Sequence, residues 1–265
     1  MPDINVSGVK VAYGDTGGGG KALLFLNAFP LNRRMWEPQV ESLSDRFRVI
    51  TVDFQGFGES DVVADRSTYS MDTFAGQAKG VIDELGVSRV VLTGLSMGGY
   101  AALAFLRLFP ESVEGLVLAD SRAEADAPEA IEKRTGQQKL IESEGPAALR
   151  DGLLGALLSD ATREKKPDVV ANVTELMDNS GEGYIGALEA MKARPDSTSD
   201  LAGISVPTLV IVGENDTLTP PDLSRKIHEN VGGSRLVVIP ESGHLSNLEA
   251  PEAFNGALAE FAGSL

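Results

Sequence analysis

Short apolar segments alternate along the chain with longer segments in which apolar residues recur every three or four positions. The first pattern predicts buried strands, and the second predicts helices with one apolar face. The segments with the strand pattern are residues 9–13, 22–27, 48–53, 89–94, 113–119, 208–213 and 235–239. Leu23-Leu24-Phe25-Leu26 is apolar at every position, which is typical of parallel strands that helices cover on both faces. The alternation predicts an α/β fold around a mostly parallel sheet.

Four helical segments accompany these strands. Residues 72–85 place their apolar side chains on one side, whereas residues 97–109 are apolar almost all round, so the second helix should lie buried against the sheet. Residues 220–231 and 251–261 have the pattern of surface helices, and each begins with a proline in or near its first turn.

The stretch from residue 122 to residue 200 differs from the rest because it contains helix-forming segments and no strand-like one. Its main predicted helices are residues 128–143, 146–158 and 184–192. Since this stretch interrupts the alternation, we expect a helical cap over the carboxyl ends of the strands, where open α/β sheets bind ligands. The expected organisation is a core of residues 1–121 and 201–265 and a cap of residues 122–200.

A serine among glycines follows the strand predicted at residues 89–94. The segment Gly94-Leu95-Ser96-Met97-Gly98-Gly99 leads from that strand into the buried helix. Glycines permit the tight turn that lifts a serine hydroxyl clear of a sheet, and a helix N-terminus below it favours developing negative charge. A structural turn serine is the alternative, because this short pattern also arises by chance. Between this strand and this helix, it indicates that Ser96 is a catalytic nucleophile.

The chain offers two histidines as candidates for a general base. A serine hydroxyl is a weak nucleophile at neutral pH and needs such a base within hydrogen-bonding reach. His228 lies among charged residues on a predicted surface helix, where a solvated side chain is expected. His244 lies in a loop beyond the last predicted strand, and this loop can fold back over the sheet edge. His244 is therefore the candidate base.

The acid that orients this histidine should follow another strand at the same edge. Asp216 comes shortly after strand 208–213, and the order Ser96, Asp216, His244 matches the order serine, acid, histidine that follows a nucleophile elbow. Its carboxylate would fix the imidazole tautomer and stabilise the imidazolium. Asp120, at the end of an earlier strand, is a rival acid, whereas Glu214 is expected to point elsewhere.

Acyl transfer also needs hydrogen-bond donors for the oxyanion of the tetrahedral intermediate. The backbone N–H of Met97, directly after the serine, is one candidate. The second should come from the loop after strand 22–27, where Phe29 can donate and Pro30 has no N–H. We therefore predict an oxyanion hole formed by the N–H groups of Phe29 and Met97.

Together these segments resemble the α/β-hydrolase superfamily, in the branch of small bacterial esterases, 3-oxoadipate enol-lactonase-like proteins and cofactor-free haloperoxidases or perhydrolases. The matching segments span nearly the whole chain and are residues 27–31, 53–60, 94–99, 207–220 and 243–244. The resemblance implies an α/β-hydrolase fold with a sheet of about eight strands flanked by helices and a cap inserted after the sixth strand.

The chain also departs from the pattern of this family in the oxyanion loop and after the third predicted strand. Asn27-Ala28 stands where many relatives have His-Gly, and Gln55 stands where many have arginine. The oxyanion role that the resemblance gives to the backbone of Phe29 survives the first change. Asp53 and Ser60 are expected to hold their loop rather than to act as catalysts.

The motifs and the resemblance imply a serine hydrolase that cleaves a carboxylic ester or lactone through an acyl-enzyme, without a metal or an organic cofactor. Perhydrolysis, in which peroxide replaces water, is one alternative, because Phe29-Pro30-Leu31 resembles the oxyanion loop of perhydrolases. The other alternative is a ligand-binding or sensor protein that keeps this fold without turnover.

Composition limits the partners. The formal charge of −16 and the lack of any basic cluster disfavour nucleic acid, and the absence of cysteine excludes disulfides and thiolate chemistry. No apolar segment approaches the length of a membrane span, and the first residues lack the pattern of a signal peptide. We expect a cytoplasmic enzyme that acts on a small molecule away from membranes, and the sequence leaves its oligomeric state open.

Overall fold

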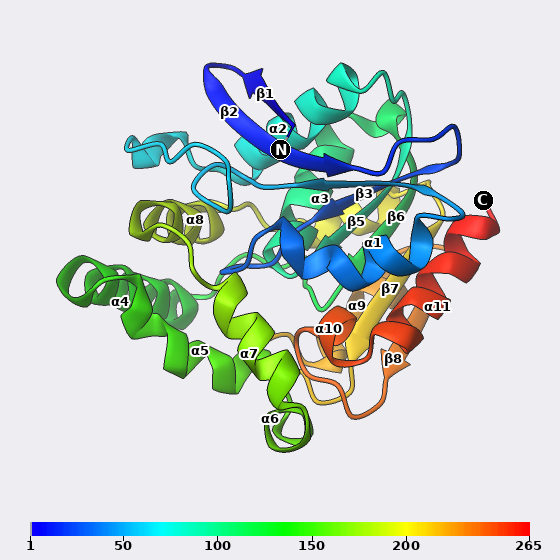
Figure 1. The fold of residues 1–265 in the computed structure, drawn as a ribbon. Coiled ribbons are helices and arrows are strands. Elements are labelled where there is room, and N and C mark those ends of the chain that lie inside the picture. Colours follow the sequence, from blue (N-terminus) through cyan, green and yellow to red (C-terminus); the bar gives the residue numbers. More distant parts are fainter. Residues whose placement is uncertain (1) are drawn as a thin grey trace.

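One mixed sheet forms the centre of the molecule in a computed structural model, which describes residues 2–265 apart from the side chain of Asp151 (Figure 1). Within the described residues the sheet has eight strands in the order β1-β2-β4-β3-β5-β6-β7-β8. β1 pairs antiparallel with β2, and β2 with β4, whereas all other neighbours are parallel. The strands are β1 (Asp3–Val6), β2 (Val9–Asp15), β3 (Ala22–Leu26), β4 (Arg48–Val52), β5 (Val90–Leu95), β6 (Val113–Ala119), β7 (Thr208–Gly213) and β8 (Arg235–Ile239).

Each of the seven segments with the strand pattern forms a strand, with ends shifted by at most two residues. The eighth strand, β1, escaped the pattern because its four residues, Asp-Ile-Asn-Val, are half polar and none of them is fully buried. The predicted mostly parallel sheet of about eight strands is confirmed, and the helical insertion follows the sixth strand, β6, as predicted.

Helices cover both faces of this sheet (Figure 1). Buried side chains of α2, α3 and α9 pack on one face, and those of α1 and α11 pack on the other. Residues 72–85 and 97–109, which were predicted as helices, correspond to α2 and α3. The helices are α1 (Glu37–Leu43), α2 (Met71–Glu84), α3 (Met97–Leu108), α4 (Pro128–Glu144), α5 (Arg150–Leu157), α6 (Asp160–Lys165), α7 (Pro167–Leu176), α8 (Gly181–Ala193), α9 (Pro221–Asn230), α10 (Ser246–Glu249) and α11 (Pro251–Gly263).

The core consists of two apolar layers that the sheet separates. Successive side chains of a strand point to opposite faces, so Leu24 and Leu26 of β3 pack on the side of α2 and α3. Leu23 and Phe25 of the same strand pack on the side of α1 and α11. A strand that is apolar at every position thus supplies both layers, which explains the continuous apolar segments of the sequence.

Helices α4 to α8 form a separate group between β6 and β7 and lie beside the sheet rather than on its faces (Figure 1). The predicted helices at residues 128–143 and 184–192 correspond to α4 and α8, and α6 and α7 are additional. We propose that this group is the cap of residues 122–200 on a core of residues 1–121 and 201–265. No helix in the described part of the chain is both long enough and apolar enough to cross a membrane.

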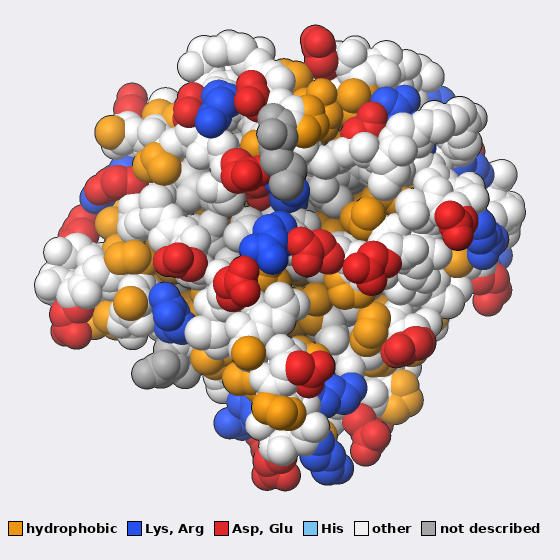
Figure 2. All heavy atoms as spheres, in the orientation of Figure 1, with side chains coloured by type: hydrophobic (Ala, Val, Ile, Leu, Met, Phe, Trp, Pro, Cys, Tyr) orange, Lys and Arg blue, Asp and Glu red, His pale blue; other side chains and the backbone are white. Residues whose placement is uncertain are grey.

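Charged side chains of both signs are interspersed over the face of the molecule seen in Figure 2, with apolar side chains between them. The excess of acidic residues, which gives the chain its formal charge of −16, is therefore not collected into one patch on this face.

Gly98, in the first turn of α3, lies where this helix meets the end of β3. A Cβ atom added there would come within 2.1 Å of the carbonyl oxygen of Leu26. In contrast, a Cβ atom added to Gly136 in the middle of α4 would meet no other atom within 4 Å. Gly98 therefore permits the close approach of two backbone segments, whereas Gly136 is a helix residue with free space around it.

We predict opposite effects on stability when each of these glycines is replaced by alanine. Gly98→Ala should lower the free energy of unfolding by about 3 kcal/mol or more, because backbone must move to admit the methyl group. Gly136→Ala should raise it by about 0.5–1 kcal/mol, because alanine is the better helix former. Urea unfolding followed by circular dichroism measures both, and equal stability of the two variants would contradict the packing described here.

Candidate active site

Loops from four parallel strands meet at the carboxyl edge of the sheet and enclose a cavity of about 270 Å³. Ser96 follows β5, Phe29 follows β3, Thr219 follows β7 and His244 follows β8. Side chains from α4, α5 and α8 form the opposite wall. The lining residues are Phe29, Ser96, Tyr100, Arg122, Ala130, Lys133, Arg134, Gln137, Leu153, Leu157, Met191, Thr217, Leu218, Thr219 and His244.

Ser96 occupies a strained turn between β5 and α3. Its φ of 54° and ψ of −114° lie in a region that L-residues rarely adopt. The turn is held by two hydrogen bonds, from the Ser96 N–H to the Ala119 carbonyl (3.0 Å) and from the Ser121 hydroxyl to the Ser96 carbonyl (3.0 Å). Both neighbours, Leu95 and Met97, are buried, whereas Ser96 is partly exposed toward the cavity. This is the geometry of a nucleophile elbow.

His244 and Asp216 form a buried hydrogen-bonded pair. The imidazole Nδ1 lies 2.8 Å from Asp216 Oδ2. Asp216 also accepts from the Thr219 hydroxyl (2.6 Å) and from the backbone N–H groups of Leu218 (2.8 Å) and Thr219 (2.9 Å). Since an ionised carboxylate only accepts, Nδ1 carries the hydrogen, and Nε2 keeps the lone pair. The pair therefore supplies an imidazole with a fixed tautomer in the cavity that Ser96 also lines.

Burial and charge compete in setting the pKa of each member of this pair. Burial raises the pKa of Asp216, but the imidazolium of His244 and the hydrogen bonds from His244 and Thr219 outweigh it, so the pKa falls below its ordinary value of 3.8. Burial lowers the pKa of His244, but the adjacent Asp216 carboxylate outweighs it, so the pKa rises above its ordinary value of 6.5. The pair favours a negative Asp216 and a readily protonated imidazole.

Asp120, the rival acid, has a different set of partners. Its carboxylate accepts from the Gly213 N–H (2.8 Å) and from the Ser246 hydroxyl, and no hydrogen bond joins it to His244 within the described residues. Full burial, and then the negative charge of Asp216, raise the pKa of Asp120 well above its ordinary value. Asp120 thus ties the end of β7 to α10 and leaves the imidazole to Asp216.

The two other rejected candidates lie away from the imidazole of His244. Glu214 accepts from the Glu241 N–H at 3.2 Å, at the surface. His228 lies on α9, where its Nδ1 is 2.8 Å from the Ser234 hydroxyl. Neither residue lines the cavity that contains Ser96.

Of the predicted oxyanion donors, Phe29 lines the cavity, and Met97 directly follows Ser96, which also lines it. In the part of the chain that the structure describes, neither backbone N–H donates to a protein acceptor, so both remain available to a ligand. Asn27, at the position where the sequence departs from the expected family pattern, donates from its side chain to the Leu31 carbonyl (2.6 Å) and closes the loop around Phe29. The altered loop thus keeps an internal hydrogen bond.

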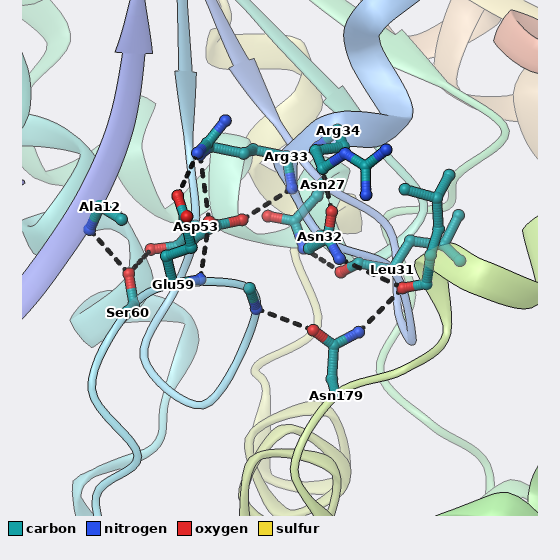
Figure 3. Close-up of polar contacts among 12 residues, drawn as sticks. Ala12, Asn27, Leu31, Asn32, Arg33, Arg34, Asp53, Glu59, Ser60 and Asn179 are labelled. Atoms are coloured by element: carbon teal, nitrogen blue, oxygen red, sulfur yellow. Dashed lines mark hydrogen bonds and ion pairs between the residues drawn. The ribbon is translucent and has the colours of Figure 1, made fainter. Parts of the chain in front are cut away.

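Asp53, directly after β4, joins the loop that follows this strand to Arg33, which lies just beyond the loop that contains Phe29 (Figure 3). Its carboxylate accepts from the backbone N–H groups of Arg33 (2.7 Å) and Glu59 (3.1 Å) and pairs with the Arg33 guanidinium (3.1 Å). The Ser60 hydroxyl donates to the Asp53 carbonyl (2.6 Å). Burial raises the pKa of Asp53 to about 6, although these donors oppose the rise. Asp53 and Ser60 therefore have the contacts of loop-holding residues, as expected.

Asn179, just before α8, extends this scaffold to the cap helices (Figure 3). Its side chain accepts from the Gly58 N–H (2.7 Å) and donates to the Pro30 carbonyl (3.0 Å). One amide therefore joins three segments that are distant in sequence, namely the loop after β3, the loop after β4 and the connection between α7 and α8.

Glu249 is a buried residue that sequence reasoning missed. Its carboxylate accepts from the backbone N–H groups of Gly243 (2.9 Å) and Ser159 (2.9 Å) and, at 3.4 Å, of Leu245. It therefore fixes the backbone on both sides of His244 and ties it to the end of α5. The available signal was an acidic residue shortly after His244 and just before the proline that opens the last helix.

Comparison with known proteins identifies the family. A family model for the α/β-hydrolase fold matches residues 21–251. The chain belongs to this family. Over 238 residues, 89% of this chain and 86% of that protein, it is 29% identical to 3-oxoadipate enol-lactonase 2 of Acinetobacter baylyi. It is also 32% identical over 259 residues to the AB hydrolase superfamily protein YisY of Bacillus subtilis, which is 93% of each chain.

A solved structure extends the likeness over the whole chain. A thermophilic esterase from Thermogutta terrifontis, with malate bound, superposes with a TM-score of 0.94 at 36% identity and covers 100% of this chain and 99% of that one. The predicted membership and fold are thereby confirmed, and the chain is an enzyme of the α/β-hydrolase family.

The pKa of His244 can be measured directly, because this α/β-hydrolase has two histidines. We predict that the imidazole signal of His244 titrates above pH 6.5 in the wild type and at lower pH in Asp216→Asn. The sign follows from the loss of the Asp216 charge, after which the burial of the imidazole is opposed only by the smaller effects of Asp120 and Glu249. Histidine NMR over a pH series measures both values, and His228→Gln assigns the signals by removing one. An unchanged or higher pKa in Asp216→Asn would contradict the pairing.

Proposed function

We propose that the chain is a serine hydrolase that cleaves a carboxylic ester or lactone, with Ser96 as nucleophile, His244 as general base and Asp216 as the acid that orients His244. The observation that carries this proposal is the buried pair of His244 and Asp216 (2.8 Å) in the same cavity wall as the strained Ser96 turn. The proposed oxyanion hole consists of the backbone N–H groups of Phe29 and Met97.

The first step is acylation. Ser96 Oγ attacks the carbonyl carbon while its proton passes to Nε2 of His244, and the negative charge that develops on the carbonyl oxygen is stabilised by the two N–H groups. Asp216 stabilises the imidazolium without taking its proton. The imidazolium then gives that proton to the leaving alkoxide, and the acyl group stays on Ser96 as an ester.

The second step is deacylation. A water molecule gives a proton to Nε2 of His244 and attacks the acyl-enzyme carbonyl, with the oxyanion again on the same two donors. Collapse of the intermediate releases the acid and returns the proton to Ser96. The same residues serve both steps because each half-reaction replaces one oxygen nucleophile by another at one carbonyl.

The relatives support an ester or a lactone as substrate, because one is a 3-oxoadipate enol-lactonase and another is an esterase. Both linkages present a carbonyl carbon to the serine, and they differ in whether the leaving alcohol remains attached to the acid. Perhydrolysis is a variant of the second step in which hydrogen peroxide takes the place of water. Peracid formation measured beside ester hydrolysis separates the two activities.

We predict that Ser96→Ala and His244→Gln each lower kcat/KM for p-nitrophenyl butyrate by at least about 10⁴-fold, since members of such a triad act as a unit. Asp216→Asn should lower it by up to about 10⁴-fold, because the imidazole then adopts the wrong tautomer. Spectrophotometric release of nitrophenolate measures these rates.

The matched control is His228→Gln, which removes the other histidine from a surface helix and should keep wild-type activity. Circular dichroism checks that each variant is folded. Folded Ser96→Ala with wild-type activity would overturn the nucleophile, and damage from Asp120→Asn with an active Asp216→Asn would overturn the choice of acid.

A further inference from the structure

The cavity that contains Ser96 has a positive lining in a negative protein. Arg122, Lys133 and Arg134 are among its 15 lining residues, and these include no aspartate or glutamate. In the whole chain, acidic residues outnumber lysine and arginine by 39 to 23. The charge of the cavity lining is therefore opposite in sign to the net charge of the protein.

The positive charge of this wall is not neutralised by its ion pairs. Three guanidinium groups, those of Arg122 (2.8 Å), Arg134 (2.5 Å) and Arg194 (2.8 Å), share the single buried carboxylate of Asp126. Three cations on one anion leave two positive charges in excess. The Nε atom of Arg122 is buried without a hydrogen-bond partner in the described structure, so a donor remains to be satisfied.

Lys133 adds a further cation, and no ion pair or hydrogen bond joins its side chain to another described residue. Together with Ala130, Arg134 and Gln137 it forms the stripe of α4 that faces the cavity. The spacing i, i+3, i+4, i+7 is the one at which a helix normally presents apolar residues inward. Here three of the four residues are polar, two of them are cationic and Lys133 is exposed, which suits a cavity that receives a charged ligand from solvent.

The cationic residues of this wall line the same cavity as the serine, although they are distant from it in the chain. Arg122 directly follows Ser121, whose hydroxyl donates to the Ser96 carbonyl (3.0 Å). Arg194 lies over the ring of Tyr100, at 4.1 Å from its centroid, and Tyr100 lines the same cavity. Apolar side chains complete the lining: Phe29, Leu153, Leu157, Met191 and Leu218.

We propose that the substrate of this enzyme is an anionic ester or lactone, whose free carboxylate binds to Arg122, Lys133 and Arg134 while its carbon chain lies on the apolar lining. The assignment rests on the proposed function, because it takes the reacting carbonyl to be at Ser96. Guanidinium groups bind carboxylates through paired charge-assisted hydrogen bonds, and Lys133 contributes as a point charge.

The test compares esters that differ in one group. The first pair is p-nitrophenyl hydrogen adipate and p-nitrophenyl 6-methylheptanoate, in which an isopropyl group replaces the carboxylate of the acyl part. The second pair is 4-(carboxymethyl)phenyl butyrate and 4-isobutylphenyl butyrate, which places the same exchange in the leaving group. In at least one pair, kcat/KM should favour the anionic ester by about 10-fold or more, as expected for a charged hydrogen bond. The preference should shrink as salt rises.

Variants of the wall connect this preference to the named residues. Lys133→Gln and Arg134→Gln should each lower the ratio of kcat/KM for the anionic ester to that for the neutral ester by several-fold, and the double variant should abolish the preference. Lys139→Gln, an exposed lysine of the same helix that does not line the cavity, is the matched control and should keep the wild-type ratio. Circular dichroism verifies that the variants are folded.

The outcomes separate this proposal from the proposed function. Hydrolysis of both pairs without preference for either anionic ester, or a preference that survives the double variant, would overturn the anionic substrate and leave the serine mechanism intact. Failure to hydrolyse any of the esters would overturn the proposed function. In that case, calorimetric binding of hexanoate against the uncharged hexanamide still decides the carboxylate site, since hexanoate should bind more tightly and lose this advantage in Arg134→Gln.

Discussion

The hydrogen bond between Nδ1 of His244 and the carboxylate of Asp216 is the interaction on which the geometry of the site depends. Burying two ionisable groups is costly unless each is paired and its remaining hydrogen-bonding capacity is used. Asp216 meets this requirement with donors from the loop that follows β7, including the N–H and the hydroxyl of Thr219. Asp216 lies in the loop after β7 and His244 in the loop after β8. The pair can therefore form only if the backbones of these two loops lie close together.

The close approach of those loops explains the glycines at their bases. A Cβ atom on Gly213, at the end of β7, would lie 2.0 Å from the carbonyl oxygen of Gly243, next to His244. Two carboxylates then fix the two backbones, since Asp120 accepts from the Gly213 N–H and Glu249 accepts from the Gly243 N–H. Of these three buried acids, Asp120 and Glu249 bind backbone N–H groups, and Asp216 forms the hydrogen bond with the imidazole.

Much of this arrangement could be predicted from the sequence, and the rest could not, for physical reasons. Seven strands were found because each contains consecutive apolar residues. Asp216 was chosen as the acid because its place after β7 follows the chain order of the fold. β1 was missed because its residues are partly polar. Glu249 was missed because an acidic residue near His244 does not by itself reveal that its partners are backbone N–H groups. The roles of Ser96, Asp216 and His244 remain predictions that the geometry favours.

The cavity-facing stripe of α4 illustrates a stricter limit of periodicity. A helix that faces the interior of a protein is recognised by its apolar side, so the stripe of Ala130, Lys133, Arg134 and Gln137 would be assigned to solvent. An enzyme cavity reverses this rule because the partner that completes the packing is the substrate. A cationic stripe remains hydrated until a carboxylate replaces the water, and that exchange favours a substrate that carries both the charge and an apolar chain. Under the proposal of an anionic substrate, this local disagreement between pattern and position marks residues of α4 that contribute to specificity.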